Sequence, residues 1–228
     1  MAGSDPMSNS DGLNFGCDYA VFLAQECETR PKGERTRASI QIAACNLLRQ
    51  QAPQDMTIPQ LCKAAGIAHG TFYIYFPDRN VLLADTLLGF ITYLQSVMRD
   101  ASSRHPDDTI RASTTAYADM FEVNAGLMKC LLHHHDAFPE AKASFHKLNS
   151  EWIGRIVASV QNKLKQTSQS EDIDKAELLR RAHALGGMVD QYLSGLILSE
   201  DPELIALSTE RRDVINTLCL IWERGMEP

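Results

Sequence analysis

The spacing of apolar side chains constrains the fold of this chain more than any other feature. Along most of the 228 residues, apolar positions recur every three or four residues, the period of an α-helix, and no segment sustains the alternation of a β-strand. Because 44% of the residues are apolar, a chain of this length can bury a sizeable core. We therefore predict an all-α protein.

A pair of short helices is predicted in the first third of the chain. Residues 58–65 carry apolar side chains at positions i, i+3, i+4 and i+7, and Thr57 in front of them is a suitable N-cap. Gly66 is expected to end this helix in the left-handed conformation, and a new helix is expected over 68–75. Two short helices joined by a corner that contains glycine form a helix-turn-helix.

Aromatic residues crowd into the second of these helices. Phe72 and Phe76 fall on one face at i and i+4 and are expected to pack inward, whereas His69 and Tyr73 share a different face. A helix this short is not stable alone, so the inward aromatics are expected to anchor it to its neighbours. We interpret the remaining polar and aromatic face as a contact surface.

Charge is distributed unevenly along the chain. The net charge of −7 divides into −5 over residues 1–29, +4 over residues 30–80 and −6 over residues 81–228. A compact basic segment inside an acidic protein favours a module that faces a polyanion. A chance fluctuation of composition is the alternative.

The sequence shows no address for export or membrane insertion. Its opening residues lack the basic start and apolar core of a signal peptide, and no continuous apolar run has the length of a membrane span. The six cysteines contain no C-x-x-C pair, so reduced thiols in a cytoplasmic protein are expected.

The segment 36–83 resembles the DNA-binding domain of the TetR (tetracycline-repressor) family of transcriptional regulators. Its most specific part, AGIAHGTFYIYFPDRNVL, is similar to the family pattern a-G-v-s-x-g-t-l-Y-x-y-F-x-s-K-e-x-L without gaps. Three positions depart from the pattern: Arg79 replaces a lysine, Phe72 a smaller aliphatic residue, and Ala68 a hydroxyl residue that often caps the helix. The rest of the chain resembles the family only in being helical and of suitable length.

The resemblance implies that the helix 68–75 enters the major groove of DNA. In the family, hydroxyl and cationic side chains of this region position the helix on phosphates, and the exposed face reads bases. The DNA-binding residues implied in this way are Thr57, His69, Gly70, Thr71, Tyr73, Tyr75 and Arg79, with Arg35 and Arg37 as an arm. The alternatives are an idle surface histidine at position 69, a half-buried core phenol at position 73, and merely solvated charges in the arm.

Three regions are expected along the chain. Residues 1–31 are predicted to be a flexible N-terminal extension, residues 32–80 a helix-turn-helix DNA-binding domain, and residues 81–228 a larger helical domain for effector binding and dimerisation.

The last two helices, expected over 171–199 and 203–225, carry wide apolar stripes. By resemblance to the family they are expected to form a four-helix dimer interface. The predicted interface residues are Leu185, Gly186, Val189, Leu193, Leu196, Ile215, Leu218 and Trp222. The alternative is that both stripes close the core of the monomer.

The middle of the chain is expected to hold a largely apolar effector pocket. The candidate lining residues are Tyr93, Tyr117, Phe121, Met128, His134, Phe138 and Trp152, and the alternative for each is ordinary core packing. The run of histidines at 133–135 cannot converge on one ion, because successive helical side chains point about 100° apart. We expect no metal and no cofactor.

These features together predict a transcriptional regulator rather than an enzyme. We expect a repressor that binds a pseudo-palindromic operator as a homodimer and is released by a small-molecule effector. The alternatives are an all-α enzyme or a helical protein-interaction adaptor in which the basic segment is incidental.

Overall fold

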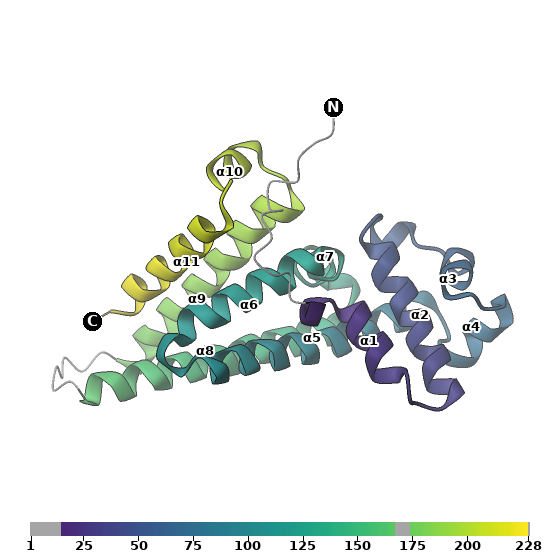
Figure 1. Cartoon of the computed structure of the whole chain (residues 1–228), viewed down its shortest axis with the longest axis horizontal. Coiled ribbons are helices and arrows are strands. Elements are labelled where there is room, and N and C mark those ends of the chain that lie inside the picture. Colours follow the sequence, from purple (N-terminus) through teal and green to yellow (C-terminus); the bar gives the residue numbers. More distant parts are fainter. Residues whose placement is uncertain (1–14, 167–173, 228) are drawn as a thin grey trace. The chain divides into compact units, whose positions relative to one another are not determined.

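The computed structural model describes residues 15–166 and 174–227, and the regular elements in these ranges are helical (Figure 1). The α-helices in chain order are α1 (Tyr19–Cys27), α2 (Lys32–Leu48), α3 (Ile58–Ala65), α4 (His69–Tyr75), α5 (Arg79–Arg104), α6 (Thr109–Val123), α7 (Ala125–His133), α8 (Pro139–Gln166), α9 (Lys175–Leu193), α10 (Pro202–Leu207) and α11 (Arg211–Met226). The predicted all-α fold is confirmed.

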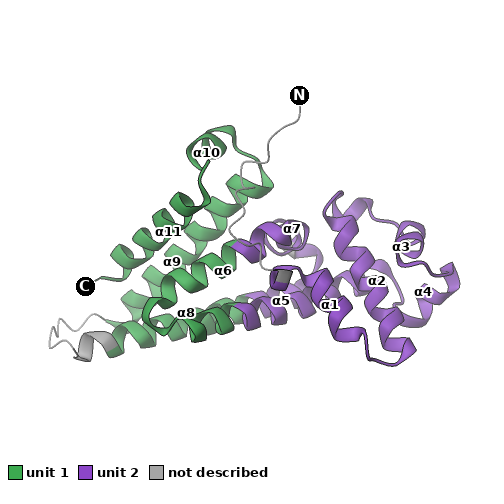
Figure 2. Cartoon of the chain, viewed as in Figure 1, with its two compact units in different colours: residues 1–11, 98–118, 146–228 green, residues 12–97, 119–145 purple. Residues whose placement is uncertain are grey.

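The helices belong to two compact units, which Figure 2 colours separately. Among the described residues, the purple unit holds 15–97 and 119–145, and the green unit holds 98–118, 146–166 and 174–227. α5, α6 and α8 each contribute residues to both units. The purple unit contains the predicted helix-turn-helix domain, and the division at residue 80 stays a prediction.

The helix-turn-helix forms as its local signals predict. The Thr57 side chain accepts a hydrogen bond from the Gln60 backbone N–H while the Gln60 side chain accepts one from the Thr57 N–H, which is a capping box at the start of α3. Gly66 ends α3 in the left-handed conformation with φ of +66°. α4 begins three residues later, and it packs against α3.

The described part of the predicted N-terminal extension is folded, which corrects the prediction of flexibility from residue 15 onward. α1 packs along α2, and the Tyr19 ring is 2% exposed with its centroid 5.6 Å from that of Phe90. Phe22 stacks on Tyr93 at 4.3 Å. These partners lie far away in the sequence, so the local pattern of a nine-residue helix gave no sign of them. Residues 1–14 lie outside the described part of the chain.

A buried asparagine fastens α1 to the loop between α6 and α7. The Asn124 amide donates to the carbonyls of Cys17 (2.7 Å) and Met120 (2.9 Å), and its oxygen accepts from the Tyr19 N–H at 3.0 Å. Nearby, a Cβ added at Gly126 would lie 2.3 Å from the Leu48 carbonyl oxygen, so only glycine lets α7 approach the end of α2 this closely. The two contacts make α1, α2 and α7 one packed body.

In the green unit α9 and α11 pack against each other, and the predicted single helix over 203–225 is wrong. α10 ends at Leu207, and α11 begins at Arg211 after a turn. Ser208 in that turn is buried and its hydroxyl lies 2.8 Å from the hydroxyl of Tyr192. Leu207, an apolar residue within the expected helix, is 74% exposed at the end of α10.

The predicted dimer residues are for the most part core residues of their own unit. Val189, Leu193, Leu196, Ile215, Leu218 and Trp222 are each at most 8% exposed in the single chain. Leu185 and Gly186 are half-buried. The apolar spacing of the sequence predicts the inward-facing residues of these helices. It does not predict that Leu220 and Ile221 of α11 are exposed on the outward face.

α5 is long and apolar enough to span a membrane by length and mean hydropathy, although its continuous apolar runs are short and interrupted by polar residues. Half of the 18-residue segment of α5 that has this hydropathy is buried inside the chain. A core helix of a folded domain has the same properties.

Candidate nucleic-acid interface and effector cavity

The short helix α4 is held by two aromatic side chains and presents others outward. Phe72 and Phe76 are 0% exposed, as predicted for the anchors. Tyr73 is 50% exposed, and its ring lies 5.3 Å from the exposed ring of His69. A half-exposed aromatic pair on a helix fixed from behind is a surface built for contact.

One exposed residue of α4 was not among the residues predicted from the sequence. Ile74 is 77% exposed, the most exposed large apolar side chain in the described part of the chain. Ile74 is two residues away from both Phe72 and Phe76, and residues at this spacing point to the opposite face of a helix. Its exposure could therefore have been predicted from the burial of the two phenylalanines. Gly70 is exposed beside it, and Thr71 and Tyr75 are half-buried.

The two arginines at the edges of α4 make contacts within the protein. Arg79 Nη1 donates to the carbonyls of Gln54 (2.9 Å) and Met56 (2.6 Å), which fixes the loop that precedes α3. Arg37 pairs with Asp85 at 2.8 Å, and its guanidinium lies 4.4 Å from the centre of the Phe76 ring. Sequence reasoning assigned both arginines to DNA and missed these supporting roles.

The remaining predicted contacts differ in how accessible they are. Arg35 is exposed on the first turns of α2. Thr57 is exposed too, but its hydroxyl caps α3. Ala68 makes no capping hydrogen bond at the start of α4, in line with its departure from the family pattern.

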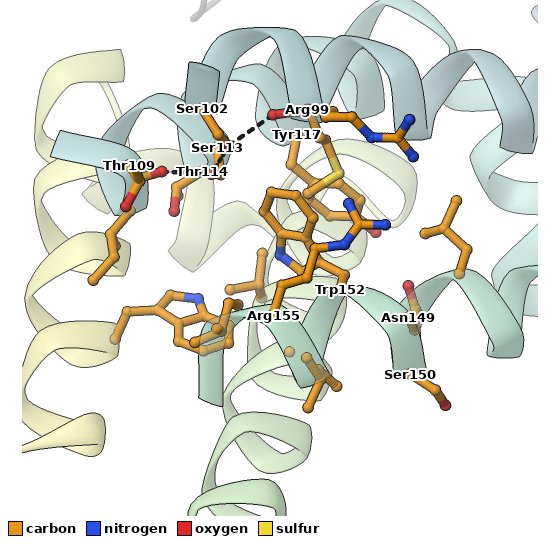
Figure 3. A pocket seen from close by; sticks show the side chains of 18 of the residues that line it. Arg99, Ser102, Thr109, Ser113, Thr114, Tyr117, Asn149, Ser150, Trp152 and Arg155 are labelled. Atoms are coloured by element: carbon orange, nitrogen blue, oxygen red, sulfur yellow. Dashed lines mark hydrogen bonds between the residues drawn. The ribbon is translucent and has the colours of Figure 1, made fainter. Parts of the chain in front are cut away.

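A cavity of about 530 Å³ lies in the green unit (Figure 3). α5, α6, α8 and α9 contribute to its wall, and Trp222 comes from α11. Its apolar lining residues are Met98, Ile110, Leu148, Trp152, Ile153, Ile156, Val189 and Trp222. The volume is in the usual range for sites that hold small organic molecules.

Two of the seven predicted pocket residues line this cavity: Tyr117 and Trp152. The other five, Tyr93, Phe121, Met128, His134 and Phe138, lie in the purple unit and do not line it. Phe121, Met128 and Phe138 are at most 3% exposed and fill the core there. Apolar periodicity identifies buried side chains, but it does not say which of them border an empty volume.

The cavity also contains polar groups that the sequence did not single out. The Tyr117 hydroxyl donates to a carboxylate oxygen of Asp190 at 2.5 Å. Burial raises the pKa of Asp190 to about 6, against the lowering effect of that hydrogen bond, and burial likewise raises the pKa of Tyr117 well above its usual value. The Ser102 and Ser113 hydroxyls lie 2.9 Å apart on a neighbouring part of the wall.

The segment that contains α4 is similar to a family of known proteins. Residues 41–86, which run from α2 through α3 and α4 into α5, match the model of the family described as bacterial regulatory proteins, tetR family. This match confirms the predicted resemblance to the TetR family for this segment. Together with the regulators described below, it confirms the predicted class, a DNA-binding transcriptional regulator.

Relatives of this chain extend over most of its length. The transcriptional regulator EthR of Mycolicibacterium smegmatis is 24% identical over 196 residues, which cover 85% of this chain and 87% of that protein. EthR of Mycobacterium tuberculosis is 26% identical over 198 residues, with coverages of 85% and 88%. Both relatives are named as regulators and not as enzymes.

Solved structures with the same fold include two regulators named FadR. The fatty acid degradation regulator FadR from Bacillus halodurans has a TM-score of 0.61 at 14% identity, covering 81% of this chain and 94% of its own. FadR from Bacillus subtilis, solved in complex with stearoyl-CoA, has a TM-score of 0.59 at 14% identity, with coverages of 79% and 96%.

The contacts of Arg79 predict a stability effect that is independent of DNA. Replacing Arg79 with alanine leaves two carbonyls without their donor, so the free energy of unfolding in urea should fall by about 1–2 kcal/mol in the absence of DNA. The control Arg35→Ala removes an exposed arginine of α2 and should change it by less than about 0.5 kcal/mol. Equal stability of Arg79→Ala and wild type would show that Arg79 does not support the loop.

Proposed function

We propose that this regulator is a cytoplasmic, non-enzymatic repressor that binds a pseudo-palindromic operator as a homodimer and releases it when a small molecule occupies the cavity. The observation that carries the proposal is α4: its buried Phe72 and Phe76 fix its orientation while Tyr73, His69 and Ile74 stay exposed. A rigid helix with an outward contact face fits the major groove, which admits one α-helix.

Within the groove, the exposed residues of α4 divide into two roles. His69, Gly70 and Tyr75 are proposed to approach base edges, and Ile74 offers an apolar surface to thymine methyl groups. Thr71 and Tyr73 are proposed to donate hydroxyl hydrogen bonds to phosphates, which position the helix without reading sequence.

The flanking residues are proposed to support this arrangement. Arg35 and Thr57 lie on exposed surface of α2 and at the start of α3, where flanking phosphates are within reach of a docked duplex. Arg37 and Arg79 hold the loop and helices around α4 through the contacts described above. For these two arginines, a phosphate contact would use guanidinium nitrogens other than those already donating within the protein.

The homodimer is proposed to use the outward face of α11. Leu220 and Ile221 on this face are 53% and 39% exposed, although the rest of the apolar surface of α11 is buried. Ala184 and Gly187, exposed on α9, would allow a second copy to approach closely. Two copies are needed because a single short helix reads too few base pairs, whereas a dimer reads two half-sites about one turn of DNA apart.

The cavity is proposed as the effector site. Its apolar walls suit a molecule with a large apolar part, and the stearoyl-CoA complex of Bacillus subtilis FadR supports the view that this fold can hold such a ligand. An effector shifts the protein out of its DNA-binding state only by the difference between its affinities for the two states. α5 begins four residues after α4 and carries the cavity residues Met98, Arg99 and Ser102 in its last turns, and it is proposed to carry that shift.

Selection of bound fragments from random duplex DNA tests the proposal directly. We expect an inverted repeat to be enriched and its binding to weaken steeply with salt. Tyr73→Phe removes one hydroxyl and should lower affinity about tenfold, by the same factor for selected and unrelated duplexes. Ile74→Ala should change the sequence preference, and the distant control Arg212→Ala should behave as wild type. Failure to enrich any sequence would refute the proposed function.

The proposed interface makes a separate prediction about assembly. Leu220→Glu places a charge at the centre of the outward face and should convert the dimer to a monomer in sedimentation velocity, with an unchanged helical circular dichroism spectrum. Arg212→Glu changes an exposed residue near the start of the same helix and should remain dimeric. A dimer that survives Leu220→Glu would place the interface elsewhere.

A further inference from the structure

The cavity contains an acid without a cationic partner. Asp190 of α9 accepts a hydrogen bond from the Tyr117 hydroxyl at 2.5 Å. In the described part of the chain, no lysine, arginine or histidine nitrogen lies within ion-pairing distance of its carboxylate. Asp190 is half-buried, and a carboxylate in this position with one neutral donor is incompletely stabilised, since partial burial removes some of the water that would otherwise solvate its charge.

The charge of this carboxylate persists at neutral pH. Burial is the largest influence on the pKa of Asp190 and raises it to about 6, and the hydrogen bond from Tyr117 acts in the opposite direction. A group with this pKa is mainly ionised at pH 7.5. The cavity therefore offers a negative charge to whatever enters it.

The basic residues of the cavity wall do not neutralise Asp190. Arg99 and Arg155 are exposed, and Arg155 lies 3.9 Å from Glu151 instead. His146 and His183 also line the cavity. None of these four is among the causes that shift the pKa of Asp190, as a close cation would be.

Aromatic side chains complete the arrangement. Trp152 and Trp222 line the same cavity as Asp190, together with aliphatic residues of α8 and α9. The faces of indole rings attract cations, and their edges and the aliphatic walls suit an apolar body.

We propose that the cavity recognises an amphipathic cation, a protonated amine attached to an apolar body, whose ammonium group pairs with Asp190 while the body lies between Trp152 and Trp222. Tyr117 is the positioning residue, because its hydroxyl holds one carboxylate oxygen. This inference rests on the proposed role of the cavity as the effector site and specifies the chemistry of the effector.

A set of three probes with the same apolar chain tests the head-group preference. Decylamine, decanol and decanoate are titrated below their aggregation limits into the full chain at pH 7.5. The readout is intrinsic tryptophan fluorescence, which reports on the cavity because Trp152 and Trp222 are the only two tryptophans of the sequence. We expect decylamine to bind at least tenfold more tightly than decanol or decanoate.

Two variants assign the preference to the carboxylate. Asp190→Asn keeps an oxygen that can accept from Tyr117 but removes the charge, so it should bind decylamine and decanol equally. Tyr117→Phe keeps the charge but removes the hydroxyl that holds one carboxylate oxygen, so it should retain a preference for decylamine that is smaller than in the wild type. Preference for the amine that persists in a folded Asp190→Asn variant would overturn the assignment.

The pH dependence supplies a second readout. Decylamine stays protonated from pH 5 to 7.5, whereas Asp190 gains a proton as the pH falls through about 6. Wild-type affinity for decylamine should therefore fall about tenfold from pH 7.5 to pH 5. The other titratable and charged groups that face the cavity are Arg99, Tyr117, His146, Arg155 and His183. Asp190→Asn retains all of them, so it should show a much smaller change.

The outcomes separate this inference from the proposed function. Equal or tighter binding of decanol or decanoate, or no response to any probe, overturns the inference and leaves operator binding, measured separately, untouched. Decylamine that binds through Asp190 without weakening binding to the selected duplex supports the inference and refutes the proposed release of DNA.

Discussion

The proposed DNA-binding surface depends on the packing of two phenylalanines beneath a helix of seven residues. A helix of this length has too few internal hydrogen bonds to persist alone. Phe72 and Phe76, both fully buried, tie it to the helices behind it, and Arg37 adds a cation above the Phe76 ring. Because the inward side holds α4 in place, the outward side can carry the polar, aromatic and apolar side chains of His69, Tyr73 and Ile74. An exposed apolar side chain is unfavourable in water unless it contacts a partner.

The local features of this region were predictable because each is encoded within a few residues. The N-cap at Thr57 and the left-handed Gly66 follow from short sequence signals, and the burial of Phe72 and Phe76 follows from their spacing. The folded α1 was not predictable in the same way, since Tyr19 is buried by aromatic residues of α5 that lie far along the chain.

In the rest of the chain, the spacing of apolar residues was not sufficient to predict the candidate sites. A stripe indicates that a side chain is buried, but not whether it meets its own core, a cavity or a second copy. Leu218 and Trp222 share the stripe predicted for the dimer, yet one is core and the other lines the cavity. The apolar residues that remain exposed on the same helix are Leu220 and Ile221. Asp190 was missed because a single acid in a helix carries no periodic signal.

The protein combines α4, which we propose to read DNA, with a cavity that we propose to select its ligand by chemistry. The cavity wall combines apolar surface, two indole rings and one half-buried acid, so selectivity is expected to come from a few polar atoms rather than from shape alone. α5 supplies residues both next to α4 in the sequence and at the cavity, and we propose that a small change at one end of this continuous helix alters the other.

The most direct test of the central claim is site-specific photo-crosslinking to bound duplex DNA. A photoreactive group attached to Ile74→Cys would sit on the outward face of α4, and the same group on Ile221→Cys would sit on α11. The account predicts efficient crosslinking to the selected duplex from position 74 and none from position 221. A chain that binds the duplex but crosslinks from position 221, or equally from both, would contradict the claim that α4 is the DNA-reading helix.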